Sequence, residues 1–402
     1  MKLRHFILGS FVVLSACQEK LTSPADCPAL CPGGQPQVFD EVISPILGAD
    51  SSFSGYVQPA AALALLASNG LRGFEERAVM RFPPRSDSVS VRDTLRAYTI
   101  DSIAFGFTIV ARDTTLPGLQ LQLYRLPPLI DSTTTYAQLD PAFVPENLIT
   151  TVPVPDTVKT GPVRVLLQGA DLARVAIPPA DSGVLSVGIR VDAATVTGVR
   201  LGAASGGNGG VFLTYATLDV PDTGTAKLRS FPLTATFNSS LSAVPEVVDG
   251  TQLVVGGSPA SRALIRFDLP PRIRDSATVV RATLELTPVE PISGLPTDPV
   301  RFRARAVLAD LGAKSPVESQ VGVAADTVEA GTSGTVGIEI ARLMQLLWLG
   351  SSRPTALVLS LAPELEAGSF SRPIFYSTRA TDPAVRPRLR ISYLLAFPFE
   401  HP

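Results

Sequence analysis

Short stretches in which every second residue is apolar run along the chain, and turn residues separate them. The clearest is LQLQLYRL (119–126), where Leu119, Leu121 and Leu123 alternate with Gln as in a strand with one buried face. Four other stretches have the same character: RAVMRF (77–82), IDSIAFGFTIV (100–110), VLSVGIRV (184–191) and VFLTY (211–215). The clearest helical pattern is short, IEIARLMQLLWLG (338–350). The pattern therefore predicts an all-β fold.

A second series of strand-like stretches follows a linker that we predict at 219–230. Its members are RALIRFDL (262–269), VVRATLELTPV (279–289), VRFRARAVL (300–308), TALVLSL (355–361) and RPRLRISY (386–393). The hexapeptide Arg77–Phe82 recurs in similar form as Arg262–Phe267, 185 residues later, and the strands that follow keep a similar offset. This recurrence indicates two copies of one module in tandem. We predict antiparallel β-sandwich modules over 37–218 and 231–395, followed by a tail at 396–402, and expect the second module to fold on its own.

The N-terminal segment MKLRHFILGSFVVLSAC reads as an export signal. Lys2 and Arg4 precede an apolar stretch, residues 6–14, that is far shorter than the ~20 residues of a membrane span. Leu14–Cys17 resembles the lipobox of bacterial lipoproteins, in which a thiol accepts the diacylglyceryl group. We therefore expect a signal peptide over 1–16 and lipidation of Cys17. The alternative is an ordinary secretory signal with an incidental cysteine.

A lipidated Cys17 makes the membrane a partner of this chain, because two or more acyl chains anchor a protein stably. Gln18 follows the cysteine, and by resemblance to known sorting rules it favours the outer membrane. Residues 17–36 are rich in Pro, Gly and Ser and predict a disordered tether. Within them, Cys27 and Cys31 leave three readings open in an oxidising periplasm: a disulfide, free thiols or a metal site.

Composition limits the partners and the chemistry. The formal net charge of −2, which becomes −4 once Lys2 and Arg4 are removed, gives no electrostatic reason to bind nucleic acid. The hydrophobic fraction of 45% supports a large core. Aromatic residues make up only 6%, and Phe82, Phe105 and Phe267 fall at inward positions of the predicted strands, where core packing explains them.

The sequence contains few of the residues that common catalytic sites require. The chain has two histidines, His5 in the signal peptide and His401 beside the C-terminus, so a Ser-His-Asp triad or a zinc site lacks its imidazoles. Glycosidase or lyase chemistry needs only carboxylates, Tyr or basic residues and stays open. Asp249 and Asp268 are unremarkable candidates for a calcium site, and metal binding stays undetermined. We expect no catalytic residue and no cofactor.

The second copy resembles the DNRLRE, or disaggregatase-related, modules of bacterial surface and secreted proteins. The resemblance covers roughly residues 250–395. It is carried, in order, by Ala263–Leu269, Arg281–Leu286, Arg342–Gly350 with Trp348, and Arg386–Tyr393. Residues 37–218 keep the RAVMRF strand but lack the closing RPRL signature. The resemblance implies a jelly-roll β-sandwich similar to carbohydrate-binding modules, with no reaction and with no ligand residue to carry over.

Together these patterns predict a non-enzymatic cell-envelope lipoprotein made of two tandem jelly-roll-like sandwiches. A surface binding or adhesion module for glycan is the expected function, with the ligand-binding residues unassigned. Two alternatives stay open: a structural subunit of an envelope assembly with protein partners, and a polysaccharide-degrading enzyme.

Overall fold

The structure, a computed structural model, describes thirteen segments of the chain. They are residues 37–54, 64–71, 75–86, 88–91, 93–175, 183–203, 213–220, 229–243, 250–257, 260–318, 324–348, 356–363 and 370–395. The predicted signal peptide (1–16), the tether (17–36) with Cys17, Cys27 and Cys31, and the tail (396–402) lie outside the described residues. The fold is all-β with several antiparallel sheets, which confirms the predicted fold class.

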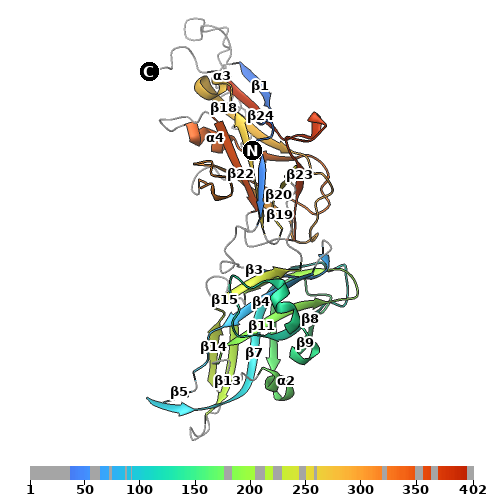
Figure 1. The fold of residues 1–402 in the computed structure, drawn as a ribbon, viewed down its shortest axis with the longest axis vertical. Coiled ribbons are helices and arrows are strands. Elements are labelled where there is room, and N and C mark those ends of the chain that lie inside the picture. Colours follow the sequence, from blue (N-terminus) through green and yellow to red (C-terminus); the bar gives the residue numbers. More distant parts are fainter. Residues whose placement is uncertain are drawn as a thin grey trace, which may run out of the picture.

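One β-sandwich is built from both ends of the described chain, residues 37–54 and 250–395, and we call it the outer jelly roll (Figure 1). Its first sheet has the order β1 (Val38–Ile43), β24 (Arg388–Leu395), β18 (Ala277–Leu286) and β21 (Val336–Glu339). Its second sheet has the order β2 (Ser51–Ser54), β17 (Ser261–Asp268), β22 (Ala356–Pro363), β19 (Val300–Ala306) and β20 (Ala324–Val328). One strand pair and two helices complete it. The pair is β16 (Gln252–Val254) and β23 (Ile374–Tyr376), and the helices are α3 (Pro271–Ser276) and α4 (Ala341–Trp348).

The second β-sandwich, residues 64–243, is the inserted jelly roll. One sheet has the order β3 (Ala64–Asn69), β12 (Gly198–Ala203), β7 (Thr99–Arg112) and β10 (Gly161–Leu167). The other has the order β4 (Glu75–Phe82), β11 (Leu185–Asp192), β8 (Gln120–Leu126) and β9 (Leu148–Pro153). Because β3 also pairs with β4 at Ser68 and Glu76, the two sheets join into one curled sheet.

Further elements decorate the inserted jelly roll. They are β13 (Leu213–Asp219), β14 (Arg229–Thr234), β15 (Phe237–Ser242), the hairpin β5 (Ser88–Val91) and β6 (Thr94–Ala97), α1 (Tyr136–Leu139) and α2 (Gly169–Arg174). The first half of β7 pairs with β13 and the second half with β12, so this long strand joins the added ribbon to the sandwich. Strand β14 extends the ribbon beyond β13, and β15 pairs with β4.

The two sandwiches share one topology. Apart from β2, which pairs with β17 as β15 pairs with β4, eight strands of each copy fall in the same chain order into two sets of four paired strands. This order of pairing is that of a jelly roll. Arg77–Phe82 lies in β4 and Arg262–Phe267 in β17, which occupy equivalent places in the two copies. LQLQLYRL and VRFRARAVL, which the similar offset matches, lie in β8 and β19, and these strands also occupy equivalent places in the two copies.

The strand pairing nevertheless divides the chain differently from the predicted boundaries. Strands β1 and β2, placed in the first module by the sequence, pair with β24 and β17 of the outer jelly roll. Strands β14 and β15, placed in the linker and the second module, pair with β13 and β4 of the inserted one. The copies are therefore nested: one jelly roll is inserted into the other between β2 and β16. Alternation of apolar residues marks a strand but carries no information about which distant strand is its partner.

Each jelly roll has its own core between its sheets. In the inserted one, the rings of Phe82 and Phe105 lie 6.1 Å apart, and in the outer one those of Phe302 and Phe375 lie 6.0 Å apart. Phe82, Phe105 and Phe267 are 1%, 3% and 0% exposed, which confirms their predicted core positions. The alternation in LQLQLYRL is confirmed as well, because Leu121 and Leu123 are buried in the core.

The jelly rolls contact each other along the outer side of β3 and β12. Leu66 packs in a small buried cluster with Leu295 and Phe370 of the outer jelly roll. Beside it, Nη1 of Arg200 lies 2.5 Å from Oδ1 of Asp298, whose side chain is 3% exposed. Burial raises the pKa of Asp298, and the guanidinium of Arg200 opposes that shift. This contact joins the two copies through a small apolar patch and one buried ion pair.

Candidate functional site

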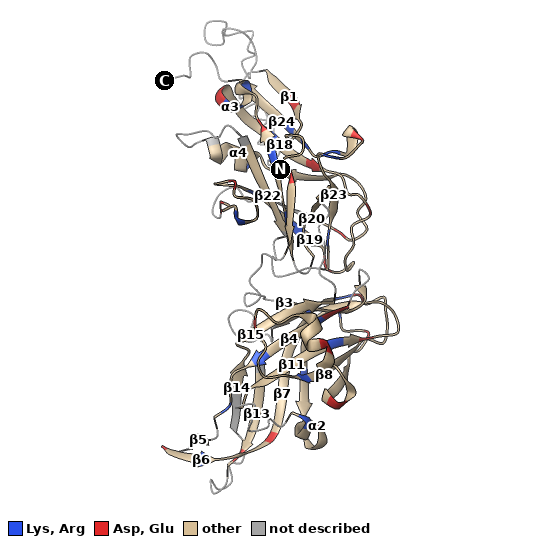
Figure 2. Cartoon of the chain, viewed as in Figure 1, with Lys and Arg blue, Asp and Glu red and all other residues tan. Residues whose placement is uncertain are grey.

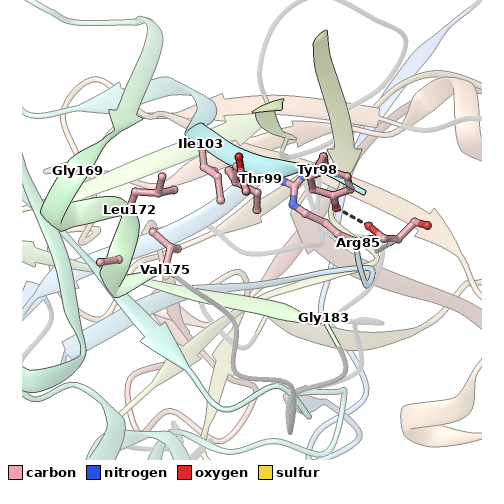
Figure 3. A pocket seen from close by; sticks show the side chains of 11 residues that line it. Arg85, Tyr98, Thr99, Ile103, Gly169, Leu172, Val175 and Gly183 are labelled. Atoms are coloured by element: carbon pink, nitrogen blue, oxygen red, sulfur yellow. Dashed lines mark hydrogen bonds between the residues drawn. The ribbon is translucent and has the colours of Figure 1, made fainter. Parts of the chain in front are cut away.

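A cavity of about 520 Å³ lies in the inserted jelly roll. We call it the distal cavity. The β5–β6 hairpin and α2 beside it lie at the end of this sandwich that points away from the outer jelly roll (Figure 1). The start of β7, helix α2 and the residues that flank the hairpin border the cavity. Its size falls within the range of small-ligand pockets, which typically measure about 300–1,000 Å³. Figure 3 shows the side chains that line it.

One side of the distal cavity is apolar. Ile103 of β7 and Val175, the residue after α2, are 2% and 1% exposed and belong to the core of the inserted jelly roll. Leu172 of α2 packs against the same core and faces the cavity in Figure 3. Ile100 and Ala173 extend this surface toward solvent. The apolar wall is thus backed by the sandwich core, which fixes its shape.

The opposite side carries a cation, Arg85, three residues after the end of β4. Its Nη2 donates a hydrogen bond to Oγ1 of Thr214 at 3.0 Å, and its Nε is buried without a hydrogen-bond partner. Burial lowers the pKa of Arg85, and nearby Tyr98 works in the opposite direction. Arginine stays charged despite such shifts. Within the described part of the chain, no carboxylate pairs with this guanidinium.

The backbone on both sides of Arg85 is held in place by Gly183. The Arg85 backbone N–H donates to the carbonyl of Gly183 at 3.3 Å. Gly183 has a φ of +76°, and a Cβ there would lie 3.2 Å from the Arg85 carbonyl oxygen. A side chain at position 183 would therefore be strained and would crowd Arg85. Gly183 is a positioning residue of the cavity.

Tyr98 closes the cavity beside Arg85 at the base of the β5–β6 hairpin. Its hydroxyl donates to the carbonyl of Ser86, drawn as the dashed line in Figure 3. This bond links the two ends of the segment that contains the hairpin. The hairpin projects from the inserted jelly roll in Figure 1, and Leu95 within it is 74% exposed. The cavity therefore opens beside a protruding ribbon.

The lining residues suit binding better than catalysis. Among the residues that the structure describes, the eleven that line the cavity include no carboxylate, histidine or cysteine. The hydroxyls of Ser86 and Thr99 have no base among them, and a serine or threonine nucleophile needs one. The cavity offers an apolar wall, one guanidinium and a few hydroxyls. These groups can bind and orient a ligand.

Other buried charges serve the fold. Arg77 lies between the rings of Tyr136 and Phe143, with its Cζ 4.3 and 4.1 Å from their centroids. Its Nε and Nη2 lie 2.7 Å from Glu75 and 2.8 Å from Asp140. Burial raises the pKa of Tyr136 to about 12, and Arg77 partly opposes it. This cluster fastens the loop after β8 to the outer side of β4, and its charges are matched.

The charged residues of the described chain lie dispersed over both jelly rolls (Figure 2). Many form ion pairs on the surface, such as Arg272 with Glu41 at 2.6 Å. Arg266, equivalent to Arg81 in the other copy, binds both oxygens of Asp310. Arg85 differs from these arginines because it borders a cavity and meets no carboxylate among the described residues.

The sequence named few site residues, and the structure tests some of them. Asp268 ends β17 with its side chain exposed, whereas Asp249 lies outside the described residues. In the described segments, no group of three or more His, Cys, Asp or Glu residues gathers to hold a metal ion. Trp348, which belongs to the resemblance, is the last residue of α4. The lipidation of Cys17 and the states of Cys27 and Cys31 stay predictions.

Arg85 and Tyr98 were missed by the sequence analysis. Arg85 follows two prolines in a segment that reads as a connection between strands. What makes it part of a cavity is the approach of α2, more than eighty residues later in the chain. A single sequence gives no signal for that approach.

Comparison with known proteins adds no relative. Neither models of protein families nor curated protein sequences match this chain. The resemblance to DNRLRE-type modules therefore stays a prediction that rests on the quoted residues. In the part of the chain that the structure describes, no helix is long and apolar enough to cross a membrane.

Proposed function

We propose that this chain is a non-enzymatic lipoprotein of the bacterial cell envelope that binds a glycan in the distal cavity. The observation that carries the proposal is the cavity itself: a concave site with an apolar wall and one cation, built from the start of β7, helix α2 and the connecting residues beside them. Loops on a rigid scaffold are where binding residues concentrate. The described lining residues include no carboxylate, histidine or cysteine, which supports binding without a reaction.

The position of the cavity fits a protein that presents a ligand-binding end away from its anchor. Val38 pairs with Leu394, so the described chain begins and ends side by side. That end of the outer jelly roll, beside α3, is opposite to the loops that contact the inserted jelly roll (Figure 1). A lipid on Cys17, held by the tether, places the outer jelly roll next to the membrane and the cavity at the far end.

A glycan array with residues 18–402, the mature chain without its lipid-bearing cysteine, tests the proposal. We expect binding to a restricted set of glycans. Ala173→Phe places a ring at the cavity and should abolish that binding, whereas Ala170→Phe changes the same helix α2 at a position outside the lining and should preserve it.

Three results would contradict the proposal. An array on which no glycan binds would exclude a glycan as the ligand. Glycan binding that survives Ala173→Phe would move the site away from the distal cavity. Shorter products in mass spectra of a bound oligosaccharide would favour the alternative of a polysaccharide-degrading enzyme.

A further inference from the structure

The chemistry of the distal cavity points to the charge of its ligand. Arg85 presents a guanidinium with five N–H donors, of which one is used by Thr214. Its Nε is buried and unpaired, and no described carboxylate neutralises the charge. A buried charge or donor without a partner is costly. From these contacts we infer that the distal cavity binds a carboxylate carried on an apolar body, with Arg85 as its partner.

The acid follows from the geometry of the guanidinium. A planar guanidinium forms two parallel hydrogen bonds with a carboxylate, and such charge-assisted bonds are shorter and stronger than neutral ones. The Nη2 atom keeps its bond to the Thr214 hydroxyl, which fixes the guanidinium at the cavity. A cationic ligand would be repelled, and a neutral one would leave the charge of Arg85 unmatched.

The apolar body follows from the opposite wall. Ile100, Leu172 and Ala173 offer carbon surface at the cavity, and no acceptor lies among these three side chains. The buried residues Ile103 and Val175 lie behind this surface in the core. Sugar hydroxyl groups placed against this wall would lose their water without replacement hydrogen bonds, so the wall favours an acyl substituent of a glycan over the sugar ring itself. An alkyl or acyl group would instead bury apolar area against the wall.

This inference deepens the proposed function, because it concerns the same cavity. A carboxylate on an apolar body has two sources: an acidic acyl substituent on a glycan, or a free fatty acid. The chemistry of recognition is the same for both, and the experiment separates them by testing octanoate in solution beside the glycan array.

Isothermal titration calorimetry with residues 18–402 compares octanoate, octanamide and octylamine. The three share one alkyl chain and differ in the head group. We expect octanoate to bind at least tenfold more tightly than octanamide, and octylamine not to bind. Arg85→Gln should weaken octanoate binding about 10–100-fold, the range of a hydrogen bond to a charged group. Arg85→Lys should recover part of the loss.

Arg164→Gln, an exposed arginine in β10 outside the lining, is the matched control and should leave binding unchanged. Thermal melting of each variant checks that the inserted jelly roll is folded, and Ala173→Phe should block octanoate by filling the cavity. Equal affinity for octanoate and octanamide, no binding of octanoate, or full binding by a folded Arg85→Gln variant would each overturn the inference.

The two proposals fail separately. Octanoate binding that depends on Arg85, together with a blank glycan array, would leave the acidic ligand and remove the glycan. Glycan binding that is lost in Ala173→Phe but retained in Arg85→Gln would keep the proposed function and overturn the acidic ligand.

Discussion

Removing strand β1 is expected to unfold the outer jelly roll, although more than two hundred residues separate this strand from every other strand of that sandwich except β2. Strand β1 forms six residue pairs with β24, which lies between β1 and β18 in the sheet. A fragment of residues 231–395 lacks β1 and β2 and carries most of β14 and all of β15 without their partners. The structure therefore predicts that this fragment does not fold cooperatively, contrary to the expectation from the repeat.

The size of the effect can be worked from two side chains. Ile43 is 6% exposed in the core, and deleting a buried isoleucine side chain costs about 2–5 kcal/mol. Phe39 is half-buried and stacks on Tyr393 with 5.6 Å between ring centroids, which adds about 0.5–1.5 kcal/mol beyond its buried area. Domains are stable by about 5–15 kcal/mol. Losing both side chains and the ladder removes a large part of that.

The assay compares two chains by differential scanning calorimetry and near-ultraviolet circular dichroism. One is residues 231–395. In the other, an eight-residue Gly/Ser linker, which spans about 15 Å, joins residues 37–54 to 250–395 in place of the inserted jelly roll. We expect a cooperative transition only in the joined chain. In the full chain, Ile43→Ala should lower the transition that belongs to the outer jelly roll, whereas Val42→Ala, at a position 47% exposed, should change it little.

A cooperative transition of residues 231–395 at the temperature of the joined chain would refute the nested pairing. So would equal effects of Ile43→Ala and Val42→Ala. Residues 64–243 contain all eight strands of the inserted jelly roll and should fold alone, which provides the positive control.

Three further predictions follow from single residues. Cys17→Ser should abolish incorporation of a fatty-acid label and leave the precursor uncleaved, and equal labelling of the variant would contradict lipidation at Cys17. Gly198→Ala would bring a Cβ within 2.8 Å of Cζ of Phe370, so the contact between the jelly rolls should lose about 1–3 kcal/mol. The calorimetric transitions of the two jelly rolls should then separate, and a single unchanged transition would argue against this contact. The hydrogen bonds from Arg266 lower the pKa of Asp310, so their stabilising contribution is present above about pH 4 and is lost as the pH falls through the lowered pKa. Urea titrations at several pH values should show this loss of stability in the wild type and not in Asp310→Asn, and the same dependence of stability on pH in both proteins would contradict it.

The sequence predicted the strands well where local alternation defines them. LQLQLYRL, the recurring hexapeptide and the stretch that becomes β24 all lie in strands at equivalent or closing positions of the two sandwiches. The sequence did not predict which distant strands pair, because nothing in VFDEVI (38–43) identifies its partner at Arg388–Leu395. The sequence could not predict the distal cavity for the same reason, since Arg85 and α2 come together only in the folded chain.

Nesting also sets an order of events during folding. Val38 pairs with Leu394, so the first described strand must wait for the last one. The inserted jelly roll has all its partners once Ser242 has emerged, and it can fold while β1 and β2 are still unpaired. Pairings between such distant residues form slowly, and unpaired strands are prone to aggregate meanwhile. A chain exported through a membrane in an extended state would therefore need β1 to stay free until translocation ends, which makes the interval between export and closure its most vulnerable period.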